Sequence, residues 1–360
     1  MAAARVPGLA LALIDDGVVV YERAYGVADR EAGTPLRTDS VMAGASLTKA
    51  AFAHLVLQLV DDGTLSLDAP ITALLRKPLP DYDGFADLRT DPRWQRLTPR
   101  MLLSHTSGLL NWRWINDDKT LDFKFHPGSR FVYSGEGIQV LQLIVEERTG
   151  EPLTQLMKRR VFDRFGMSDT SMTWRADFER RAVIGYDADG KPLAHARRTT
   201  AGAAGSMDTT VHDYARFLAA VLRGDGLSAA SARAMLSPQI AIVSPQEFPS
   251  HWLGETEVNR AIGLSYGLGW GVYTSPLGRA FFKEGHDDAT NNVALGFATP
   301  KRGIVMLSNS GNAERMFLPA IQALFGETCL PWFWMGYIPY SHPELAAPGA
   351  RDHPVPPCGG

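Results

Sequence analysis

Short apolar runs near both ends of the chain predict β-strands. Gly8–Ile14 and Val18–Tyr25 flank Asp15-Asp16-Gly17, a turn sequence that favours a hairpin. Toward the other end the predicted strands are Leu264–Tyr273, Arg279–Lys283, Asn291–Ala298 and Gly303–Ser308. Strands at both ends with helices between them predict an α+β (mixed α/β) fold. One antiparallel sheet would be built from both chain ends and flanked by helices.

The helical patterns lie between these strands. Ser46–Val60 is apolar on most sides, which predicts a helix buried in the middle of the protein, and Asp61-Asp62-Gly63 ends it. The other predicted helices are Pro99–Leu103, Gly137–Arg148, Leu153–Phe165, Thr210–Leu222 and Ala313–Phe325. We therefore expect a sheet domain from residues 1–70 and 190–328 and an inserted, mainly helical domain at 71–189. Residues 329–360 should form a tail that wraps the surface without regular structure.

Composition narrows the function classes. The 360 residues are 45% hydrophobic and 21% charged with a net charge of −3, as in an ordinary soluble enzyme. No basic surplus points to nucleic acid, and no apolar stretch is long enough to span a bilayer. Cys329 and Cys358 lack the CxxC spacing of a zinc site, so no metal is expected. They form either one disulfide or two free thiols.

A serine and a lysine stand three residues apart in Ser46-Leu47-Thr48-Lys49. At the start of a helix they share one face, where a lysine in apolar surroundings can lose its proton and activate the serine. The alternative is an N-cap serine beside a solvated lysine. Because the helix is apolar nearly all round, Lys49 needs a polar partner in the interior.

Two further motifs carry candidate chemistry. In Tyr133-Ser134-Gly135 the phenol, if held between cationic groups, can become a phenolate and act as a general base. The alternative is a tyrosine that packs at a domain boundary. In Lys283-Glu284-Gly285 the glycine permits close approach of a ligand to the strand edge. Otherwise this is an exposed Lys/Glu pair before a turn.

The order of the three motifs resembles the serine β-lactamase and penicillin-binding-protein superfamily, especially class C β-lactamases, D-alanyl-D-alanine carboxypeptidases and related esterases. The resemblance runs from about Val6 to Phe325. It includes four landmark segments, at Ala43–Lys49, Leu102–Leu109, Ala204–Thr209 and Tyr266–Trp270. It implies a serine hydrolase that acts through an acyl-enzyme on a small ester, amide or peptide, without a cofactor.

The resemblance also implies residue roles. Ser46 would attack the carbonyl, Lys49 and Tyr133 would share the proton transfers, and Lys283 would help hold Tyr133. The backbone N–H groups of Ser46 and His286 would form the oxyanion hole. In a second possible register, Gly285-His286-Asp287-Asp288, the imidazole of His286 replaces the lysine and Ala289 supplies the N–H. Both registers remain open.

Two positions depart from the family pattern. Gly135 stands where an Asn often holds a substrate amide, and Glu284 (Asp287 in the second register) stands where a small residue helps bind a substrate carboxylate. A carboxylate there would repel anionic substrates if it faces them. If it points away, only its backbone matters.

We therefore expect an esterase-like or amidase-like hydrolase for neutral or cationic substrates. The alternatives are a D-aminopeptidase or D-amino-acid amidase, whose substrate ammonium Glu284, Asp287 or Asp288 would receive, and a β-lactamase or D-Ala-D-Ala carboxypeptidase. From another class, the chain could be a penicillin-binding module without turnover. The family suggests a periplasmic or secreted protein if a leader was removed, and a cytoplasmic one otherwise. Oligomeric state stays open.

Overall fold

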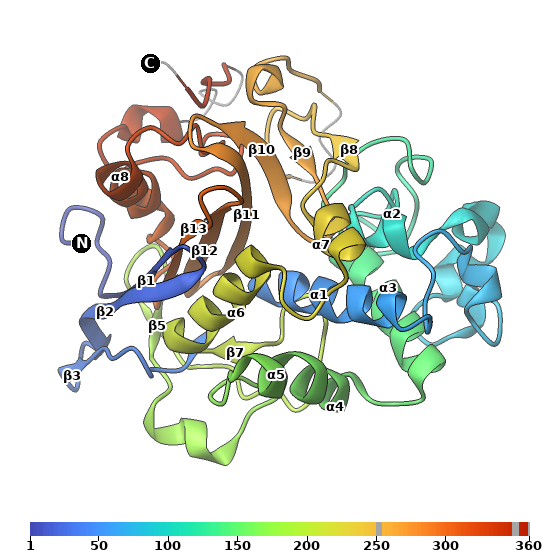
Figure 1. The fold of residues 1–360 in the computed structure, drawn as a ribbon, viewed down its shortest axis with the longest axis horizontal. Helices are drawn as coiled ribbons and strands as arrows, with labels where there is room; N and C mark the ends of the chain where they lie inside the picture. The colour runs from blue at the N-terminus through green and yellow to red at the C-terminus, as the bar shows by residue number, and fades with distance from the viewer. Residues whose placement is uncertain (250–253, 348–352, 359–360) are drawn as a thin grey trace.

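A computed structural model describes residues 1–249, 254–347 and 353–358 (Figure 1). Within them an antiparallel sheet of nine strands has the order β3-β2-β1-β13-β12-β11-β10-β9-β8. Strands from the two ends of the chain meet where β1 pairs with β13, with Leu9 opposite Ser308. This confirms the predicted α+β fold. The strands are β1 Gly8–Asp15, β2 Val18–Asp29, β3 Thr34–Pro35, β8 Ile240–Ala241, β9 Ser265–Tyr266, β10 Gly271–Ser275, β11 Gly278–Asp287, β12 Thr290–Phe297 and β13 Arg302–Ser308.

Helices cover both faces of the sheet. Alternate residues of a strand point to opposite faces, so Ala294 of β12 joins one core cluster while Val293 and Leu295 join the other. The first cluster includes residues of α1 (Leu47–Asp61) and α6 (Val211–Arg223); the second includes residues of α8 (Glu314–Phe325). In Figure 1, α6 and α8 lie on opposite sides of the sheet. The central strand β12 is buried along its whole length as a result.

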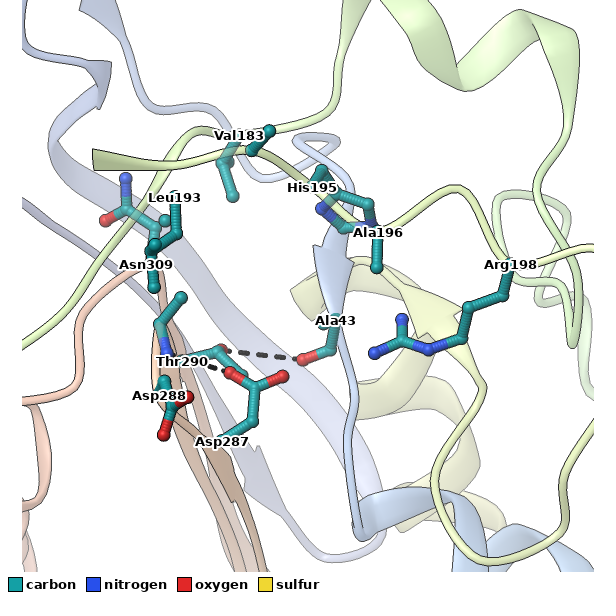
Figure 2. A pocket seen from close by; sticks show the side chains of 13 residues that line it. Ala43, Val183, Leu193, His195, Ala196, Arg198, Asp287, Asp288, Thr290 and Asn309 are labelled. Carbon is teal, nitrogen blue, oxygen red and sulfur yellow. Dashed lines mark hydrogen bonds between the residues drawn. The ribbon is translucent and has the colours of Figure 1, made fainter.

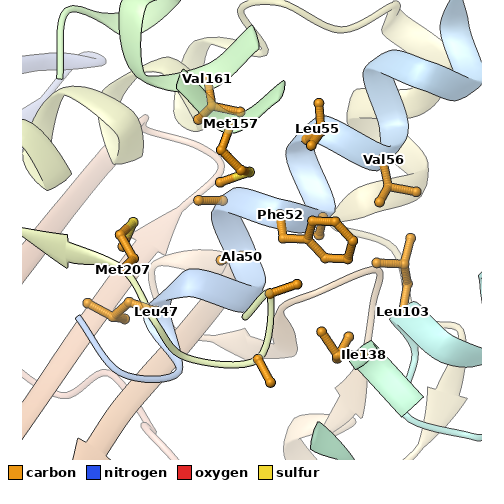
Figure 3. Packing of buried hydrophobic residues seen from close by; sticks show 14 of the residues in the cluster. Leu47, Ala50, Phe52, Leu55, Val56, Leu103, Ile138, Met157, Val161 and Met207 are labelled. Carbon is orange, nitrogen blue, oxygen red and sulfur yellow. The ribbon is translucent and has the colours of Figure 1, made fainter. Parts of the chain in front are cut away.

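The first hairpin and the central helix match the predictions. Asp16 and Gly17 have φ angles of 47° and 71°, the left-handed pair that a tight hairpin turn requires. In α1, every residue from Leu47 to Leu59 is buried. Figure 3 shows its apolar side chains packed among neighbouring helices. A short strand, β4 (Met42–Ala43), lies between the hairpin and α1. Three more short strands follow later in the chain: β5 Gly185–Tyr186, β6 Pro192–Leu193 and β7 Asp208–Thr209.

Helices fill most of the middle of the chain. The longer elements are α2 Pro99–Leu103, α3 Gly135–Thr149, α4 Leu153–Met157, α5 Asp163–Phe165 and α7 Ala229–Met235, joined by several short 3-10 turns. The predicted helix Leu153–Phe165 is helical throughout, but residues Lys158–Phe162 form a π-helical turn between α4 and α5. A π turn adds one residue to the repeat, which apolar periodicity does not reveal. That residues 71–189 form a separate domain stays a prediction.

The predicted strand Leu264–Tyr273 is wrong as a single element. The chain reverses between β9 and β10, which then pair with each other. A Cβ atom at Gly269, where φ is 87°, would lie 2.3 Å from the Cβ of Ala53, and one at Gly267 would lie 2.4 Å from the carbonyl oxygen of Met235. The glycines thus let this turn approach α1 and the end of α7 closely.

The C-terminal segment is partly core. Its buried side chains include Trp332, Phe333, Trp334, Met335 and Tyr337. They pack on the sheet face opposite α1, in the cluster that contains α8. Cys329 and Cys358 form a disulfide that closes this segment. The expected surface tail therefore begins inside the protein, because large aromatic side chains gain more from burial than a polar tail would. Residues 348–352 and 359–360 of that tail lie outside the described part.

No helix in the described part of the chain has both the length and the apolar character needed to span a membrane.

Candidate active site

Ser46 stands at the N-terminus of α1, at a tight turn. Its predecessor Ala45 has a φ of 46°, in the left-handed region that a non-glycine residue rarely adopts. The N–H of Leu47 donates to the carbonyl of Gly44, which closes the turn. Ser46 is partly exposed while the residues after it are buried. Such strain is concentrated at functional sites in proteins.

The amine of Lys49 lies beside this serine. Its Nζ is 2.9 Å from Oγ of Ser46 and donates to the carbonyl of Ala204 at 2.6 Å. Lys49 is 1% exposed. Burial, and then the positive charge of Lys283, lower the pKa of Lys49 well below its usual range. The side chain is thus set up as a neutral amine next to a hydroxyl.

Tyr133 lies between the two lysines. Nζ of Lys283 donates to Oη of Tyr133 at 3.0 Å, and Nζ of Lys49 is 5.0 Å from the centre of its ring. Burial first, and then the charges of Glu284 and Glu247, raise the pKa of Tyr133 well above 10. A resting phenolate, as the sequence suggested, is therefore disfavoured. The raised pKa favours the protonated phenol, whose Oη accepts the hydrogen bond from Lys283.

His105 contacts both Tyr133 and the residue that follows it. Its Nδ1 accepts the N–H of Ser134 at 3.2 Å, and its ring centre is 4.4 Å from that of Tyr133. Burial, followed by the charges of Lys49 and Lys283, lowers the pKa of His105 well below 6.5, so the ring is neutral. Its φ of 55° is a second strained position at the site.

Strand β11 passes directly against the start of α1. A Cβ atom at Gly285 would lie 2.5 Å from the carbonyl oxygen of Gly44 and 2.9 Å from the N of Leu47. This close approach requires glycine. The second register would need the same contact at Asp288, which instead is exposed at the tip of the hairpin between β11 and β12. The geometry therefore favours the register in which Lys283 faces the site.

Backbone alternation orients His286. Asp287 pairs with Thr290 across a two-residue turn. In an antiparallel pair alternate residues direct their N–H and C=O groups to the partner strand, so those of Asp287 and Gly285 point to β12. The N–H and C=O of His286 point away from β12. On that side β10 pairs no further than Phe282. The N–H of Ser46 takes part in no backbone hydrogen bond with the described residues. Both proposed oxyanion donors thus lie where β11 meets α1.

Two buried carboxyl groups stand behind Lys283. Glu284 is 2% exposed and forms an ion pair with Lys283. Burial alone would lower the pKa of Lys283, but Glu284 and other neighbours outweigh it and raise the pKa. Glu247 is also 2% exposed, and neither of its side-chain oxygens has a hydrogen-bond partner among the described residues. Burial and the charge of Glu284 raise the pKa of Glu247 well above its usual range.

The space beside Gly135 is filled. Its N–H donates to Oδ1 of Asn111 at 2.9 Å, and a Cβ atom at Gly135 would lie 2.8 Å from the ring of Trp112. The side chain that family members often carry at this position has no room here. An amide from Asn111 lies nearby instead.

Two hollows flank the tip of the β11–β12 hairpin. The first, of 340 Å³, is lined by Ala43, Arg198, Asp287 and Asp288 among others. In Figure 2 the side chains of Asp287 and Arg198 extend toward it from different segments. The second, of 530 Å³, is strongly acidic: its lining includes Asp187, Asp189, Asp287, Asp288 and Glu314 beside His286. In the described part of the chain, no group of three or more His, Cys, Asp or Glu side chains is arranged so that it could bind a metal ion.

Comparison with known proteins agrees with this geometry. The profile of the β-lactamase family matches residues 1–325. The chain belongs to this family. Penicillin-binding protein 4 of Amycolatopsis lactamdurans is 27% identical over 97% of this chain and 91% of its own length. Esterase EstB of Burkholderia gladioli is 35% identical over 52% of this chain and 53% of its own.

The fold has the same relatives. The structure of an octameric penicillin-binding protein homologue from Pyrococcus abyssi aligns with a TM-score of 0.72 at 22% identity, covering 91% of this chain and 75% of that one. The family and the fold therefore confirm the resemblance inferred from the motifs, and with it a serine hydrolase superfamily.

Sequence reasoning missed three parts of the site. His105 and Ala204 lie in landmark segments of the family, so a closer interpretation of those segments would have found them. Glu247 carries no such signal, because it is one acidic residue in an aperiodic stretch with prolines on both sides.

Proposed function

We propose that this member of the β-lactamase family is an esterase-like serine hydrolase whose nucleophile is Ser46. The observation that carries the proposal is the position of the buried Lys49 amine, whose Nζ lies 2.9 Å from Oγ of Ser46 and 5.0 Å from the ring centre of Tyr133. A nucleophile, a base and a proton donor are thereby assembled at one point.

In the proposed reaction, Lys49 takes the proton of Ser46 as Oγ attacks the substrate carbonyl. The N–H groups of Ser46 and His286 stabilise the oxyanion, where removal of one such donor typically costs about 10² to 10³ in rate. Tyr133 gives its proton to the leaving alcohol or amine as the C–O or C–N bond breaks, and regains one from Lys49. Water then attacks the acyl-enzyme and gives a proton to Lys49. As the bond between the acyl carbon and Oγ breaks, Tyr133 gives its proton to Oγ of Ser46 and regains one from Lys49, and the acid is released.

The proposed substrates are neutral or cationic. The support is the ion pair between Lys283 and Glu284, which is buried and already neutralises the lysine that would attract a substrate carboxylate. The exposed Asp287 and Asp288 add negative charge beside His286, where they line the second hollow. Anionic substrates therefore meet repulsion without a compensating cation.

The acidic hollow favours one second candidate, a D-aminopeptidase or D-amino-acid amidase. Its substrate carries an ammonium group, which the carboxylates around His286 would attract. β-Lactamase and carboxypeptidase activity rank lower because their substrates carry a carboxylate.

A panel of three substrates tests the proposal: a short-chain p-nitrophenyl ester, a D-amino-acid p-nitroanilide and a chromogenic cephalosporin. The expected order of kcat/KM is ester first, anilide second and cephalosporin last, with all three lost in Ser46→Ala. A cephalosporin hydrolysed faster than the ester would overturn the substrate class. One equivalent of product followed by a halt would indicate the non-turnover penicillin-binding module instead.

A further inference from the structure

A third hollow, of 180 Å³, lies beside His286. Its lining includes Gln246, Asn291 of β12, Glu314 of α8 and Trp334 of the C-terminal segment. One water needs about 10–15 Å³ of such space, so a substituent of several atoms fits. None of these side chains takes part in the reaction proposed above.

The carboxyl group of Glu314 is held in place by the neighbouring strand. Asn291 stands opposite His286 in the β11–β12 pair, so these two side chains lie on the same face of the sheet. Nδ2 of Asn291 donates a hydrogen bond to Oε2 of Glu314, the first residue of α8. All three residues line the third hollow and also the acidic second hollow. A carboxyl group is thus fixed close to the residue whose N–H is the proposed oxyanion donor.

Gln246 is an independent sign that the third hollow takes a polar ligand. Its side chain is 3% exposed, and neither its amide nitrogen nor its amide oxygen has a hydrogen-bond partner among the described residues. Buried polar groups in folded proteins are normally hydrogen-bonded, and an exception calls for a specific explanation. Because Gln246 lines the hollow, a polar group bound there would supply a missing partner.

The surroundings of Glu314 favour a cation. In the described part of the chain, neither of these two hollows is lined by a lysine or an arginine. The second hollow adds four more carboxyl groups: Asp187, Asp189, Asp287 and Asp288. The third has aromatic residues in its lining: Phe248, Trp334 and Tyr337. Carboxylates and aromatic faces both attract an ammonium group, and an ammonium N–H can donate to the amide oxygen of Gln246.

The leaving group of the substrate approaches this hollow past Phe248. The ring of Phe248 lies 5.3 Å from that of Tyr133 and 5.5 Å from that of His286. In the proposed reaction Tyr133 gives its proton to the leaving alcohol or amine, so the leaving group lies on the Tyr133 side of the carbonyl. Since Phe248 also lines the hollow, a substituent on that leaving group extends toward Glu314.

We propose that the third hollow binds an ammonium group carried by the leaving alcohol or amine of the substrate, and that Glu314, positioned by Asn291, determines this specificity. The inference rests on the proposed function for its place in the reaction, and it deepens that function by naming the leaving group. It differs from the D-aminopeptidase candidate, in which the ammonium belongs to the acyl part of the substrate.

Two acetate esters of matched shape test the specificity. Dimethylaminoethyl acetate carries a protonated amine on its leaving alcohol at neutral pH, and isopentyl acetate is its neutral isostere. The wild type should hydrolyse the cationic ester with a kcat/KM about five- to tenfold higher, mainly through a lower KM, because the ion pair with a half-buried carboxylate is partly screened. Glu314→Gln, which can still accept the hydrogen bond from Asn291, should remove the preference and leave isopentyl acetate within about twofold of wild type.

Glu257→Gln is the matched control. Glu257 is an exposed partner of Arg260 on the connection between β8 and β9, so this variant removes the same charge at the surface. It should keep the preference of the wild type. Equal kcat/KM for the two esters in the wild type, or a preference that survives in Glu314→Gln, would overturn the proposal.

The pH dependence of the preference is a second readout. Burial raises the pKa of Glu314 to about 7, so its carboxylate forms as the pH rises through that value. The preference for the cationic ester should therefore grow between about pH 6 and 7.5 in the wild type and stay flat in Glu314→Gln. A flat preference in the wild type would refute the role of Glu314.

Other titratable groups surround Glu314 on the two hollows and on α8: His286, Asp187, Asp189, Asp287, Asp288, Arg315 and Tyr337. Burial lowers the pKa of His286 below its usual range and raises that of Tyr337 well above 10. Both shifts move these groups away from pH 7, and Glu314→Gln separates the contribution of Glu314 from that of the remaining groups.

The product alcohols test the hollow without any reaction. Dimethylaminoethanol should bind the wild-type protein in saturation-transfer NMR, isopentanol should bind more weakly, and Glu314→Gln should lose the difference. Because no bond is broken, binding of the cationic alcohol through Glu314 would support the site even if the chain proved to have no esterase activity. Hydrolysis of both esters without a difference in alcohol binding would overturn the ammonium site and leave the proposed esterase function standing.

Discussion

Replacing Glu284 by threonine should change which substrates the site accepts. In this chain the carboxylate of Glu284 is buried against Lys283. Threonine is the residue type that β-lactam-active relatives carry at the matching position, so Glu284→Thr frees the lysine to attract a substrate carboxylate. We expect acylation by a carboxylate-bearing cephalosporin to speed up relative to hydrolysis of a neutral short-chain ester.

The size of the effect follows from the charges. Two unit charges about 5 Å apart at an effective dielectric of about 20 interact by about 3 kcal/mol. Removing that repulsion is worth about a hundredfold in rate. We therefore expect the ratio of cephalosporin acylation to ester hydrolysis to rise by about tenfold to a hundredfold in Glu284→Thr.

Stopped-flow acylation with the cephalosporin and steady-state hydrolysis of the ester give the two rates. Their ratio is the quantity to compare, because general damage to the site cancels from it. Glu257→Thr, on the exposed surface, serves as the control. If the ratio stays flat in Glu284→Thr, the charge of Glu284 does not reach the substrate, and selectivity would have to come from Asp287 and Asp288.

Four further predictions follow from the same geometry. Ser46→Ala should cost about 10³-fold or more in ester hydrolysis with the fold intact by circular dichroism, and substantial residual activity would exclude Ser46 as the nucleophile. Tyr133→Phe should lower kcat by about 10²-fold while stability in urea stays within about 1 kcal/mol, and unchanged turnover would assign both proton transfers to Lys49. Gly135→Asn should destabilise the protein by about 1–3 kcal/mol through contact with Trp112 and Asn111, and a gain in cephalosporin turnover would contradict this. Glu247 binds its proton more tightly when folded, so between the ordinary Glu pKa and its raised folded pKa the wild type should lose about 1.4 kcal/mol of stability per pH unit relative to Glu247→Gln, and parallel stability curves would argue against a raised pKa.

The reactive residues were predictable because they lie in regular elements with a clear apolar pattern. Ser46 and Lys49 lie at the start of a helix that is apolar nearly all round, and Lys283 lies inside a strand whose middle residues are all buried. The resemblance to a family supplied the order of the motifs. Local pattern and family likeness together were enough for the sheet, the central helix and the cluster around Ser46.

What the sequence left open depends on contacts between distant segments. The register of the third motif is decided by how closely Gly285 approaches Gly44, a contact between residues 241 positions apart that no periodicity encodes. The extension of β11 to Asp287 likewise depends on pairing with β12. The backbone N–H of Glu247 donates to the carbonyl of Trp334, near the end of the chain, which is another contact between distant segments.

The two lysines of the site have opposite roles because the pleat of β11 and the turn before α1 give them different partners. Lys283 lies on the sheet face toward α1, next in sequence to the carboxylate that pairs with it, and its pKa is raised. Lys49 has a carbonyl and a hydroxyl as its hydrogen-bond acceptors, and the charge of Lys283 nearby lowers its pKa further. Lys283 therefore helps to set the state of Lys49. Burial and the charge of Lys283 outweigh the opposing charge of Glu284, and together they favour the neutral amine that can activate Ser46.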